Sequence, residues 1–468
     1  MKMRFQLWLW LLVSLWAFTG VLGDHRERYR EREGKGEEEW EEKGSKRGLF
    51  ILDKWEKVVE SEGGEVRVVR GFGSPRDHWS GFDATHKGLL HIGFISMDPK
   101  TLFVPQYLDA GLILFVRRGE ARVGWINKDS LVERKLKMGD VVQIPAGFTF
   151  YIVNTGAGQR LQIICGIDAS ESLGLANPYE AFYLGGGTFP KSVLAGFDTK
   201  TLATALNVTF EEVDTFLGAH SRGPIVYVTD EPAGREKKHR DGGLGFLDSL
   251  AEQTIFPFKP LKNMLSWLLG IQDNNTVKTP DPYNLYDRDP GFRNNYGWST
   301  ALDEHDYKPL KYSDIGVYIV NLAAGSMMAP HVNPRATEYG IVLGGSGRIQ
   351  VVYPNGTTAM DAKVSQGDVF WIPRYFPFCQ LASLSGPFEF FGFTTSARRN
   401  YPQFLLGRSS ILKTMLGPEL AAGFGVTESS LRDLVDAQNE EVILPSWPEP
   451  ERKREKEGEE RERGVVRN

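Results

Sequence analysis

One arrangement of residues occurs twice in this chain of 468 residues, with the two copies about 228 positions apart. Glycine and proline recur at matching places in the two copies, as Gly139 and Gly367 and as Pro145 and Pro373. Further along, residues 202–209 match residues 420–427. A repeat of this length indicates that a whole domain is duplicated. The chain is therefore expected to contain two copies of one domain, each large enough to bury its own core.

Short apolar segments separated by Gly, Pro and Asn dominate each copy and predict β-strands. In the first copy they span residues 89–97, 112–116, 121–126, 141–144, 150–153 and 161–167. In the second copy they span residues 316–322, 339–343, 348–353, 369–372, 378–381 and 388–394. Because no helical pattern separates these strands, each copy is predicted to be a jelly-roll β-barrel of two sheets. The predicted fold class is thus mainly β, with two barrels in tandem.

An amphipathic helical extension is predicted after each barrel. Thr209 and Glu212 form a capping box at the start of the first helix, and Thr427 holds the corresponding position in the second. The apolar stripes of the two helices are Val213, Phe216 and Leu217, and Leu431, Leu434 and Val435. Such stripes need a partner surface, because exposed apolar patches of this kind normally mark an interface.

The first 23 residues have the pattern of a secretory signal peptide. Lys2 and Arg4 precede an apolar run over residues 7–22, which is short for a membrane span and is followed by charged residues. We expect cleavage near Gly23 and no membrane association afterwards; an uncleaved anchor is the alternative. Removal of Lys2 and Arg4 takes the formal net charge from −5 to −7, which gives no reason to expect nucleic-acid binding.

Composition divides the rest of the chain. Two densely charged segments cannot bury a core and are expected to be a disordered arm, 24–47, and a disordered tail, 449–468. Residues 48–220 and 301–448 are assigned to the two barrels with their helical extensions. Residues 221–300 are interpreted as a linker, which contains an exposed charged loop at 230–245 where proteolysis is expected.

The two cysteines and three sequons give further expectations for a secreted chain. Cys165 and Cys379 each lie in or beside an apolar strand segment, which favours two buried free thiols over a disulfide. The candidate N-glycosylation sites are Asn207, Asn274 and Asn355. Asn355 belongs to a Pro-Asn-Gly turn between two predicted strands, the most accessible setting of the three.

The C-terminal copy contains a second kind of pattern, in which a few polar residues follow glycines at regular spacing. Its first element consists of Gly325, His331, Asn333, Glu338 and Gly345, and its second of Gly367, Pro373 and Phe378. The spacing resembles the two motifs of metal-binding cupins, in which three histidines and a carboxylate hold an open metal site. Asn333 and Phe378 stand where two of the histidines are needed. The N-terminal copy has Gln106, Tyr107, Leu112 and Phe150 at these places.

We therefore expect no metal and no cofactor, and we interpret His331, Asn333, Glu338, Arg374 and Phe378 as a ligand pocket. Arg374 could hold the carboxylate of a small organic anion through two donors. The alternatives are that Asn333 or Glu338 simply satisfies a buried His331, and that Arg374 is a surface residue or forms an ion pair between subunits. A weak copper site of His331 and Cys379 is also open, although strand alternation would turn Cys379 away if Phe378 points inward.

Four segments resemble the C-terminal barrel of plant 7S globulins, the vicilins: residues 327–338, 351–356, 372–378 and 392–400. The resemblance extends over about residues 48–448. It implies a bicupin without catalytic activity, whose subunits join head-to-tail into a homotrimer through the helical extensions. It also implies a seed storage globulin, a nutrient reservoir that travels the secretory pathway to protein storage vacuoles. An extracellular location is the alternative.

The amide content leaves other functions open. The chain has 16 Asn and 12 Gln residues, which is low for a bulk storage protein of this family. A minor vicilin-like protein that binds a small organic anion or copper in defence or stress is therefore the alternative function. A metal-dependent cupin oxidase or decarboxylase is less favoured, because His331 and Glu338 are the only ligands retained at cupin spacing.

Overall fold

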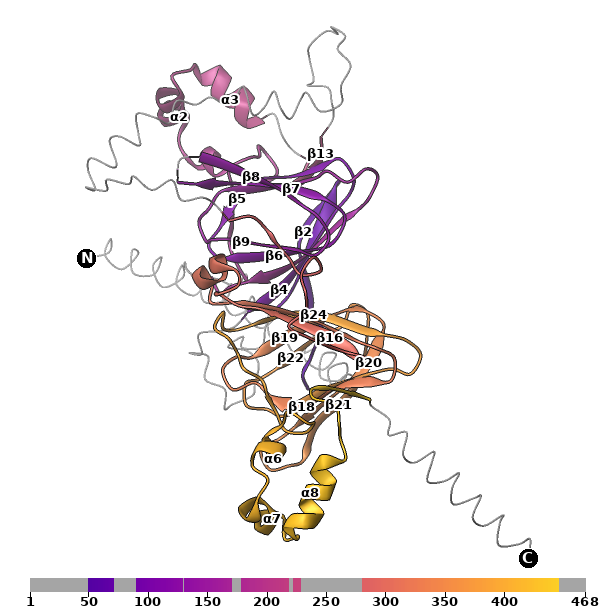
Figure 1. Ribbon diagram of the computed structural model, residues 1–468. Coiled ribbons are helices and arrows are strands. Elements are labelled where there is room, and N and C mark those ends of the chain that lie inside the picture. Colours follow the sequence, from indigo (N-terminus) through magenta and orange to yellow (C-terminus); the bar gives the residue numbers. More distant parts are fainter. Residues whose placement is uncertain are drawn as a thin grey trace, which may run out of the picture.

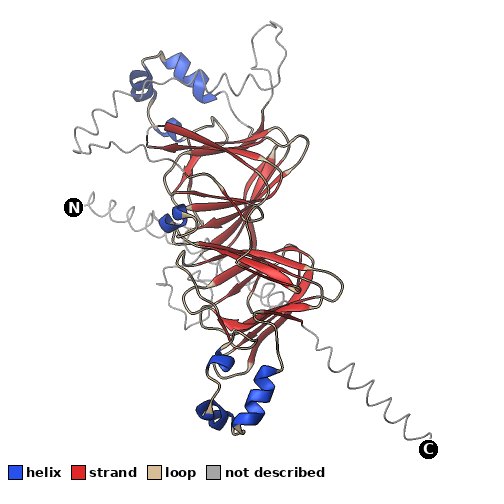
Figure 2. Ribbon diagram, viewed as in Figure 1, coloured by secondary structure: helices blue, strands red, loops and turns tan. Residues whose placement is uncertain are grey.

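The computed structural model describes residues 49–70, 90–128, 130–170, 178–218, 222–228 and 280–445. The predicted signal peptide, charged arm, charged tail and 230–245 loop lie outside these residues, as does the sequon at Asn274. Within the described part, strands far outnumber helices, and no helix is long and apolar enough to cross a membrane. The predicted fold class, two jelly-roll barrels with helical extensions, is confirmed (Figure 2).

The N-terminal barrel consists of two antiparallel sheets (Figure 1). The first has the order β14-β9-β6-β11-β4-β3-β2 and contains β2 (Trp55–Ser61), β3 (Gly64–Val69), β4 (His91–Met97), β6 (Leu112–Arg118), β9 (Asp140–Ile144), β11 (Leu161–Ile167) and β14 (Tyr283–Asn284). The second has the order β12-β5-β10-β7-β8, with β13 also paired to β5, and contains β5 (Thr101–Leu108), β7 (Ala121–Asn127), β8 (Ser130–Leu136), β10 (Phe150–Asn154), β12 (Ala181–Tyr183) and β13 (Ile225–Tyr227). Val123, Phe150 and Ile163 belong to the core that the two sheets enclose.

The C-terminal barrel repeats this arrangement. Its first sheet has the order β1-β22-β19-β24-β17-β16-β15 and contains β1 (Ile51–Leu52), β15 (Phe292–Asn294), β16 (Gly297–Leu302), β17 (Gly316–Leu322), β19 (Glu338–Gly344), β22 (Val369–Ile372) and β24 (Phe388–Thr394). Its second has the order β21-β20-β23-β18-β25, with β26 also paired to β18, and contains β18 (Ser326–Val332), β20 (Ser346–Val352), β21 (Thr358–Ser365), β23 (Phe378–Ala382), β25 (Gln403–Phe404) and β26 (Ile443–Pro445). The sheet orders of the two halves match strand for strand, as the duplicated sequence predicts.

Each barrel completes its first sheet with a strand from the other half of the chain. Strand β1 pairs with β22, with Ile51 opposite Phe370. Strand β14 pairs with β9, with Tyr283 opposite Val141. The described parts of the predicted linker 221–300 therefore contain strands of the barrels: β13 and β14 in the first, β15 and β16 in the second. The sequence did not show this for β13, β14 and β15, because strands of two or three residues have no periodicity from which pairing can be predicted.

The first sheets of the two barrels pack against each other. The Phe115 ring of β6 stacks on the Phe391 ring of β24, with centroids 3.9 Å apart. Nearby, Arg117 Nη2 donates to the carbonyl oxygen of Leu343 at 2.9 Å. Gly166 keeps the strands close, since a Cβ atom there would lie 2.9 Å from the Phe393 ring. One continuous core therefore joins the barrels, and it includes Phe115 from one half and Phe391 from the other.

The helical extensions lie at opposite ends of the molecule (Figure 1). The first contains η1 (Val193–Gly196), α2 (Thr199–Leu206) and α3 (Phe210–Gly218), the second contains α6 (Ile411–Thr414), α7 (Pro418–Phe424) and α8 (Glu428–Asp436), and a separate turn, η2 (Lys308–Tyr312), lies between the barrels. Both predicted helix starts are confirmed. Thr209 N donates to Glu212 Oε2 at 2.8 Å, and Ser430 N donates to Thr427 Oγ1 at 3.2 Å.

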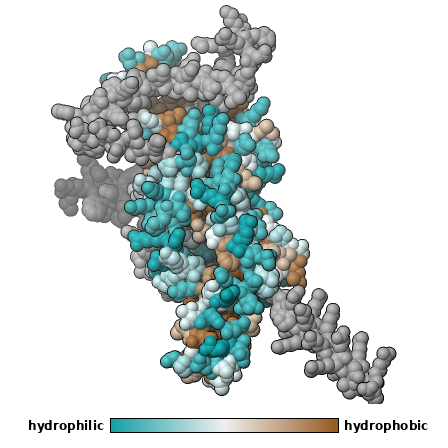
Figure 3. Space-filling view, viewed as in Figure 1, coloured by the Kyte–Doolittle hydropathy of each residue, from teal (hydrophilic) through white to brown (hydrophobic). Residues whose placement is uncertain are grey.

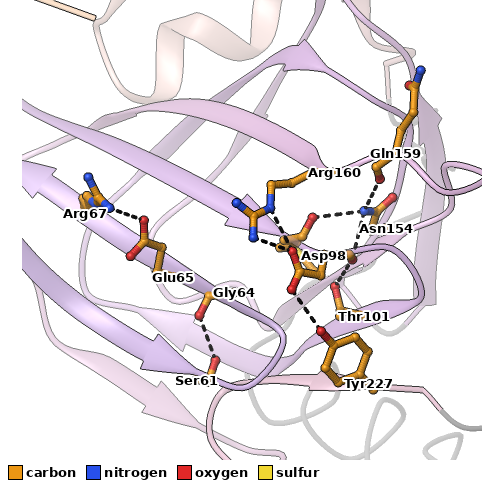
Figure 4. Close-up of polar contacts among 11 residues, drawn as sticks. Ser61, Gly64, Glu65, Arg67, Asp98, Thr101, Asn154, Gln159, Arg160 and Tyr227 are labelled. Carbon is orange, nitrogen blue, oxygen red and sulfur yellow. Dashed lines mark hydrogen bonds and ion pairs between the residues drawn. The ribbon is translucent and has the colours of Figure 1, made fainter.

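A hydrogen-bonded network holds the loops at one edge of the N-terminal barrel (Figure 4). Asp98 accepts hydrogen bonds from Arg160 Nε at 2.8 Å and from the Tyr227 hydroxyl at 2.9 Å. The buried Asn154 Nδ2 donates to the carbonyl oxygens of Met97, Asp98 and Gln159. Because Tyr227 ends β13, this network ties that strand to the loops after β4 and β10.

Candidate functional site

Four of the five predicted pocket residues converge inside the C-terminal barrel. His331 lies near the end of β18, Asn333 follows that strand, Glu338 begins β19 and Phe378 begins β23. Their side chains are between 1% and 7% exposed. His331 and Phe378 are opposite each other in the β18–β23 pairing, and their ring centroids are 4.1 Å apart. The strand ends therefore bring these residues to one place, as the motif spacing predicts.

His331 is an uncharged residue in aromatic surroundings. Its Nδ1 atom lies 2.8 Å from the carbonyl oxygen of Ala329 in the same strand, and the Phe404 ring lies 5.1 Å from its ring. Burial lowers the pKa of His331 to about 4, against a weaker opposing effect of the Ala329 hydrogen bond. One alternative from the sequence was a hydrogen bond between His331 and Asn333 or Glu338. In the structure His331 is bonded to Ala329, and Asn333 and Glu338 bond to each other.

Asn333 and Glu338 form the polar centre of the cluster. Asn333 Nδ2 donates to Glu338 Oε2 at 2.8 Å, and Asn400 Nδ2 donates to Asn333 Oδ1 at 2.7 Å. Gln380 Nε2 makes a longer bond of 3.4 Å to Glu338 Oε1. Burial raises the pKa of Glu338 to about 7, although hydrogen bonds from Tyr318 and Asn333 oppose the shift. The groups that act on this carboxyl are all neutral, so it is a buried acid without a compensating cation.

Sequence reasoning missed Tyr318, Gln380 and Asn400 as members of this cluster. Gln380 could have been found, because it lies two residues after Phe378 in the same strand and so shares its face. Tyr318 and Asn400 approach from β17 and from the chain after β24, which no local pattern indicates. The buried oxygens Gln380 Oε1 and Asn400 Oδ1 have no hydrogen-bond partner in the structure. The cluster therefore has two buried oxygen atoms available to accept hydrogen bonds from a small donor molecule.

Arg374 is not part of this buried cluster, which corrects its predicted place in the pocket. Its side chain is exposed on the turn after β22, and its guanidinium carbon lies 5.3 Å above the exposed ring of Tyr375. The backbone turns outward here because Tyr375 has a positive φ of 74° and donates its N–H to the carbonyl oxygen of Asn333. Arg374 therefore cannot hold an anion beside His331 in this conformation.

The two cysteines are free and buried, as predicted. Cys379 follows Phe378 in β23, so it faces away from the cluster, and its Sγ lies 3.6 Å from Gln350 Oε1. Burial raises the pKa of Cys379 to about 11, which keeps the thiol protonated at neutral pH. This arrangement does not favour copper held by His331 and Cys379. Within the described ranges, no three His, Cys, Asp or Glu side chains gather in a way that could hold a metal ion.

The equivalent place in the N-terminal barrel has no ligand set. Gln106 faces Phe150 in the β5–β10 pairing, as His331 faces Phe378 in the other half. Gln106 is 1% exposed and its Nε2 atom has no partner in the structure. Leu112, the counterpart of Glu338, is an apolar core residue. Both barrels thus retain the scaffold of a metal site with most ligand positions substituted.

Two of the predicted sequons lie on the surface. Asn355 is exposed in the turn between β20 and β21, where its Oδ1 accepts hydrogen bonds from Thr357 N and Thr357 Oγ1. Asn207 is exposed at the end of α2, with a left-handed backbone of φ 58°. A glycan at either position would leave the barrel cores untouched.

Comparison with known proteins agrees with this geometry. The sequence model of the family described as Cupin matches residues 83–213 and 283–431, one segment in each half. A vicilin-like seed storage protein of Arabidopsis thaliana is 50% identical over 432 residues, which cover 86% of this chain and 81% of that protein. The chain belongs to the vicilin-like proteins of the cupin family.

Solved structures show the same fold for this vicilin-like protein. The crystal structure of hazelnut (Corylus avellana) vicilin superposes with a TM-score of 0.68 at 23% identity, covering 85% of this chain and 99% of that one. A structure of Solanum melongena vicilin superposes with a TM-score of 0.69 at 18% identity, covering 86% and 98%. That structure is described as revealing different anionic ligands in structurally similar pockets. The two-barrel organisation predicted from the repeat is therefore a vicilin fold.

Proposed function

We propose that this vicilin-like protein is a seed storage globulin, a nutrient reservoir without catalytic activity. The observation that carries the proposal is the substituted site inside a retained scaffold. Asn333 and Glu338 satisfy each other, and Phe378 packs on an uncharged His331 where a metal-binding cupin needs ligands. A storage protein requires a stable, densely packed fold and no open site, and 50% identity to a seed storage protein supports this reading.

We infer that the protein assembles into a homotrimer through its helical extensions. Of the predicted stripes, only Val213 and Leu431 are buried, whereas Phe216 is 57% and Leu434 72% exposed. Figure 3 shows apolar side chains on the surface over the C-terminal extension. Exposed apolar helix faces at the two ends of one chain suit a head-to-tail contact, and such contacts close into a ring when the rotation permits.

We infer further that the chain enters the secretory pathway and reaches the protein storage vacuole. The basic and apolar start of the sequence supports entry. The exposure of Asn207 and Asn355 is compatible with glycosylation on the way. Buried free thiols do not depend on an oxidising compartment, so Cys165 and Cys379 are equally stable in a vacuole.

The storage role is tested by measuring protein abundance through the life of the seed. Quantitative mass spectrometry should find the protein rising during seed filling and falling to a small fraction within days of germination. Steady low abundance in leaf and seed alike would contradict storage while leaving the fold unaffected.

Metal content tests the absence of catalysis: protein purified without chelators should contain less than about a tenth of an equivalent of Mn, Fe or Cu.

A second candidate function is the binding of a small carboxylic acid at the Asn333–Glu338 cluster. The unpartnered oxygens Gln380 Oε1 and Asn400 Oδ1 favour it, since they can accept from a protonated acid. Because the pKa of Glu338 is about 7, an acid should bind more tightly at pH 5 than at pH 8. Calorimetric titration with acetate at both values, repeated with Asn333→Leu, tests this function. No measurable binding at either pH would end it.

A further inference from the structure

The hairpin between β20 and β21 presents the single Asn-Gly pair of this sequence to solvent. Asn355 and Gly356 are both exposed, and a Cβ atom added to Gly356 would meet nothing within 4 Å. Strand β21 is the outermost strand of its sheet, so the turn lies at an edge of the C-terminal barrel. The space around Gly356 is therefore open to water.

Two backbone hydrogen bonds fix the conformation of this turn. Gly356 N donates to the carbonyl oxygen of Tyr353 at 2.9 Å, and Tyr353 N donates to that of Thr357 at 2.9 Å. Gly356 has a φ of 81°, the left-handed backbone that commonly follows the turn in a hairpin loop of three residues. The turn therefore favours glycine after Asn355, and glycine is the residue whose backbone nitrogen is least hindered.

The side-chain amide of Asn355 is held and polarised by Thr357. Asn355 Oδ1 accepts hydrogen bonds from Thr357 N at 3.1 Å and from Thr357 Oγ1 at 2.7 Å. Donors at a carbonyl oxygen stabilise the negative charge that develops there when a nucleophile adds to the carbonyl carbon. The nearest nucleophile along the chain is the backbone nitrogen of Gly356, which closes a five-membered ring when it bonds to Asn355 Cγ. The turn thus combines an activated carbonyl with an unhindered nitrogen.

We propose that Asn355 modifies itself through a succinimide formed with the Gly356 nitrogen and so becomes a mixture of aspartate and isoaspartate. The Gly356 nitrogen loses its proton to solvent and bonds to Asn355 Cγ. The bond between Cγ and Nδ2 breaks, and Nδ2 leaves as ammonia. Water then opens the ring at either of its two carbonyl groups. In sum, a water molecule is taken up and ammonia is released, without oxidation or reduction.

The reaction requires the hydrogen bond between Gly356 and Tyr353 to open. Residues 354–358 are exposed and lie at the end of an edge hairpin, where local opening costs little free energy. The same position makes the product tolerable. Isoaspartate lengthens the backbone only within the turn, whereas the side chains of β21 that enter the core are buried further along the strand, at Met360, Ala362 and Val364.

Deamidation at Asn355 also removes a candidate glycosylation site. A glycan at this sequon is carried by Asn355 Nδ2, the atom that leaves as ammonia, and Thr357 is the third residue of the sequon. A chain deamidated before it meets the glycosylating enzyme therefore carries no glycan here and has a new negative charge at the turn instead.

Mass spectrometry of the full chain tests the proposal, with protein made in bacteria without glycans and aged at pH 8 in heavy-oxygen water. Asn355 should lose its amide at least about tenfold faster than Asn207, an exposed sequon asparagine whose β-branched neighbour Val208 has its nitrogen bonded to the Ala203 carbonyl. The product should contain heavy oxygen and include isoaspartate. Aspartate alone would indicate direct hydrolysis by water and overturn the proposal, as would equal rates at Asn355 and Asn207.

Single substitutions identify the nucleophile and the polarising donor. Gly356→Ala should slow the reaction about tenfold, because a side chain crowds the attacking nitrogen. Thr357→Ala removes one of the two donors to Asn355 Oδ1 and should slow it about threefold, the effect of one exposed hydrogen bond. Thr357→Ser keeps the hydroxyl, and Thr358→Ala changes the next exposed threonine, so both should react at the wild-type rate. An unchanged rate in Gly356→Ala would overturn the cyclisation, and an unchanged rate in Thr357→Ala would overturn the role of the hydroxyl.

Discussion

The rings of Phe115 and Phe391 stack across the boundary between the barrels, with an interplanar angle of 12°. Phe115 belongs to the first half of the duplicated chain and Phe391 to the second, and both side chains are fully buried. The contact makes the two barrels share one core, so stability is expected to be a property of the whole chain.

Phe115→Ala should lower the free energy of unfolding by about 3–5 kcal/mol, because it removes a buried ring and leaves a cavity between the barrels. Phe391→Ala should have a similar effect, and the double variant should cost less than the sum because both changes remove one contact. Urea unfolding followed by circular dichroism measures this. Ile126→Ala, at a 42% exposed side chain, serves as the control. Two separate transitions in the wild type would contradict a shared core.

The stability of the chain should depend on pH through Glu338 and His331 in opposite directions. The pKa of Glu338 is raised from 4.5 to about 7, so its contribution is fully present below about pH 4.5 and is lost as pH rises through 7. The pKa of His331 is lowered from 6.5 to about 4, so its contribution is present above about pH 6.5 and is lost as pH falls through 4. Between these limits the two effects partly cancel in the wild type.

Glu338→Gln should separate the two effects. Relative to wild type, this variant should gain roughly 3 kcal/mol of stability between pH 4 and pH 8, because it cannot ionise in the core. His331→Gln should show the opposite trend relative to wild type. Unfolding in urea at pH 4, 6 and 8 provides the comparison. A Glu338→Gln difference that stays constant with pH would mean that Glu338 does not titrate in this range.

Leu434→Asp should convert the proposed homotrimer into monomers, because the change places a charge in the apolar contact proposed for α8 at a cost of the order of several kcal/mol. Light scattering should give about three times the mass of the mature chain for wild type and one mass for the variant. Ser429→Asp adds the same charge in the first turn of α8, on another face, and should remain trimeric. A monomeric wild type would refute the role given to the helical extensions.

Cleavage between Val228 and Pro280 should leave the two pieces of the chain associated. Strand β1 belongs to the second barrel's sheet and β14 to the first barrel's sheet, so each piece supplies a strand to the other. Phe50, buried between Trp371 and Phe376, adds a hydrophobic anchor. After limited proteolysis, gel filtration should give the mass of the uncut protein, while denaturing electrophoresis shows two bands. Separation of the two pieces of the wild type without denaturant would contradict the exchange of β1 and β14 between the barrels. The variant Phe50→Asp should separate more readily than wild type, because it places a charge in the hydrophobic anchor.

The sequence by itself determined the duplication, the class of fold and the starts of the main helices. Alternation along short strands decides which side chains enter a barrel, so Phe378 inward and Cys379 outward followed from period two alone. The capping residues Thr209 and Thr427 act within one turn of helix, so their bonds needed no tertiary information. Motif spacing also identified the four buried residues His331, Asn333, Glu338 and Phe378, because it indicates where strands begin and end.

Only the tertiary structure decided which distant segments meet. No local sequence pattern places β1 against β22 or β14 against β9. Strands β1 and β14 have only two residues each, so their pairing depends on the free sheet edge that each of them completes. Tyr318, Gln380 and Asn400 reach the cluster from three separate segments, and burial raises the pKa of Glu338 although the hydrogen bonds from Tyr318 and Asn333 oppose the shift. Arg374 points outward because Tyr375 adopts a left-handed backbone on bonding to Asn333, a contact between loops that residue spacing cannot show.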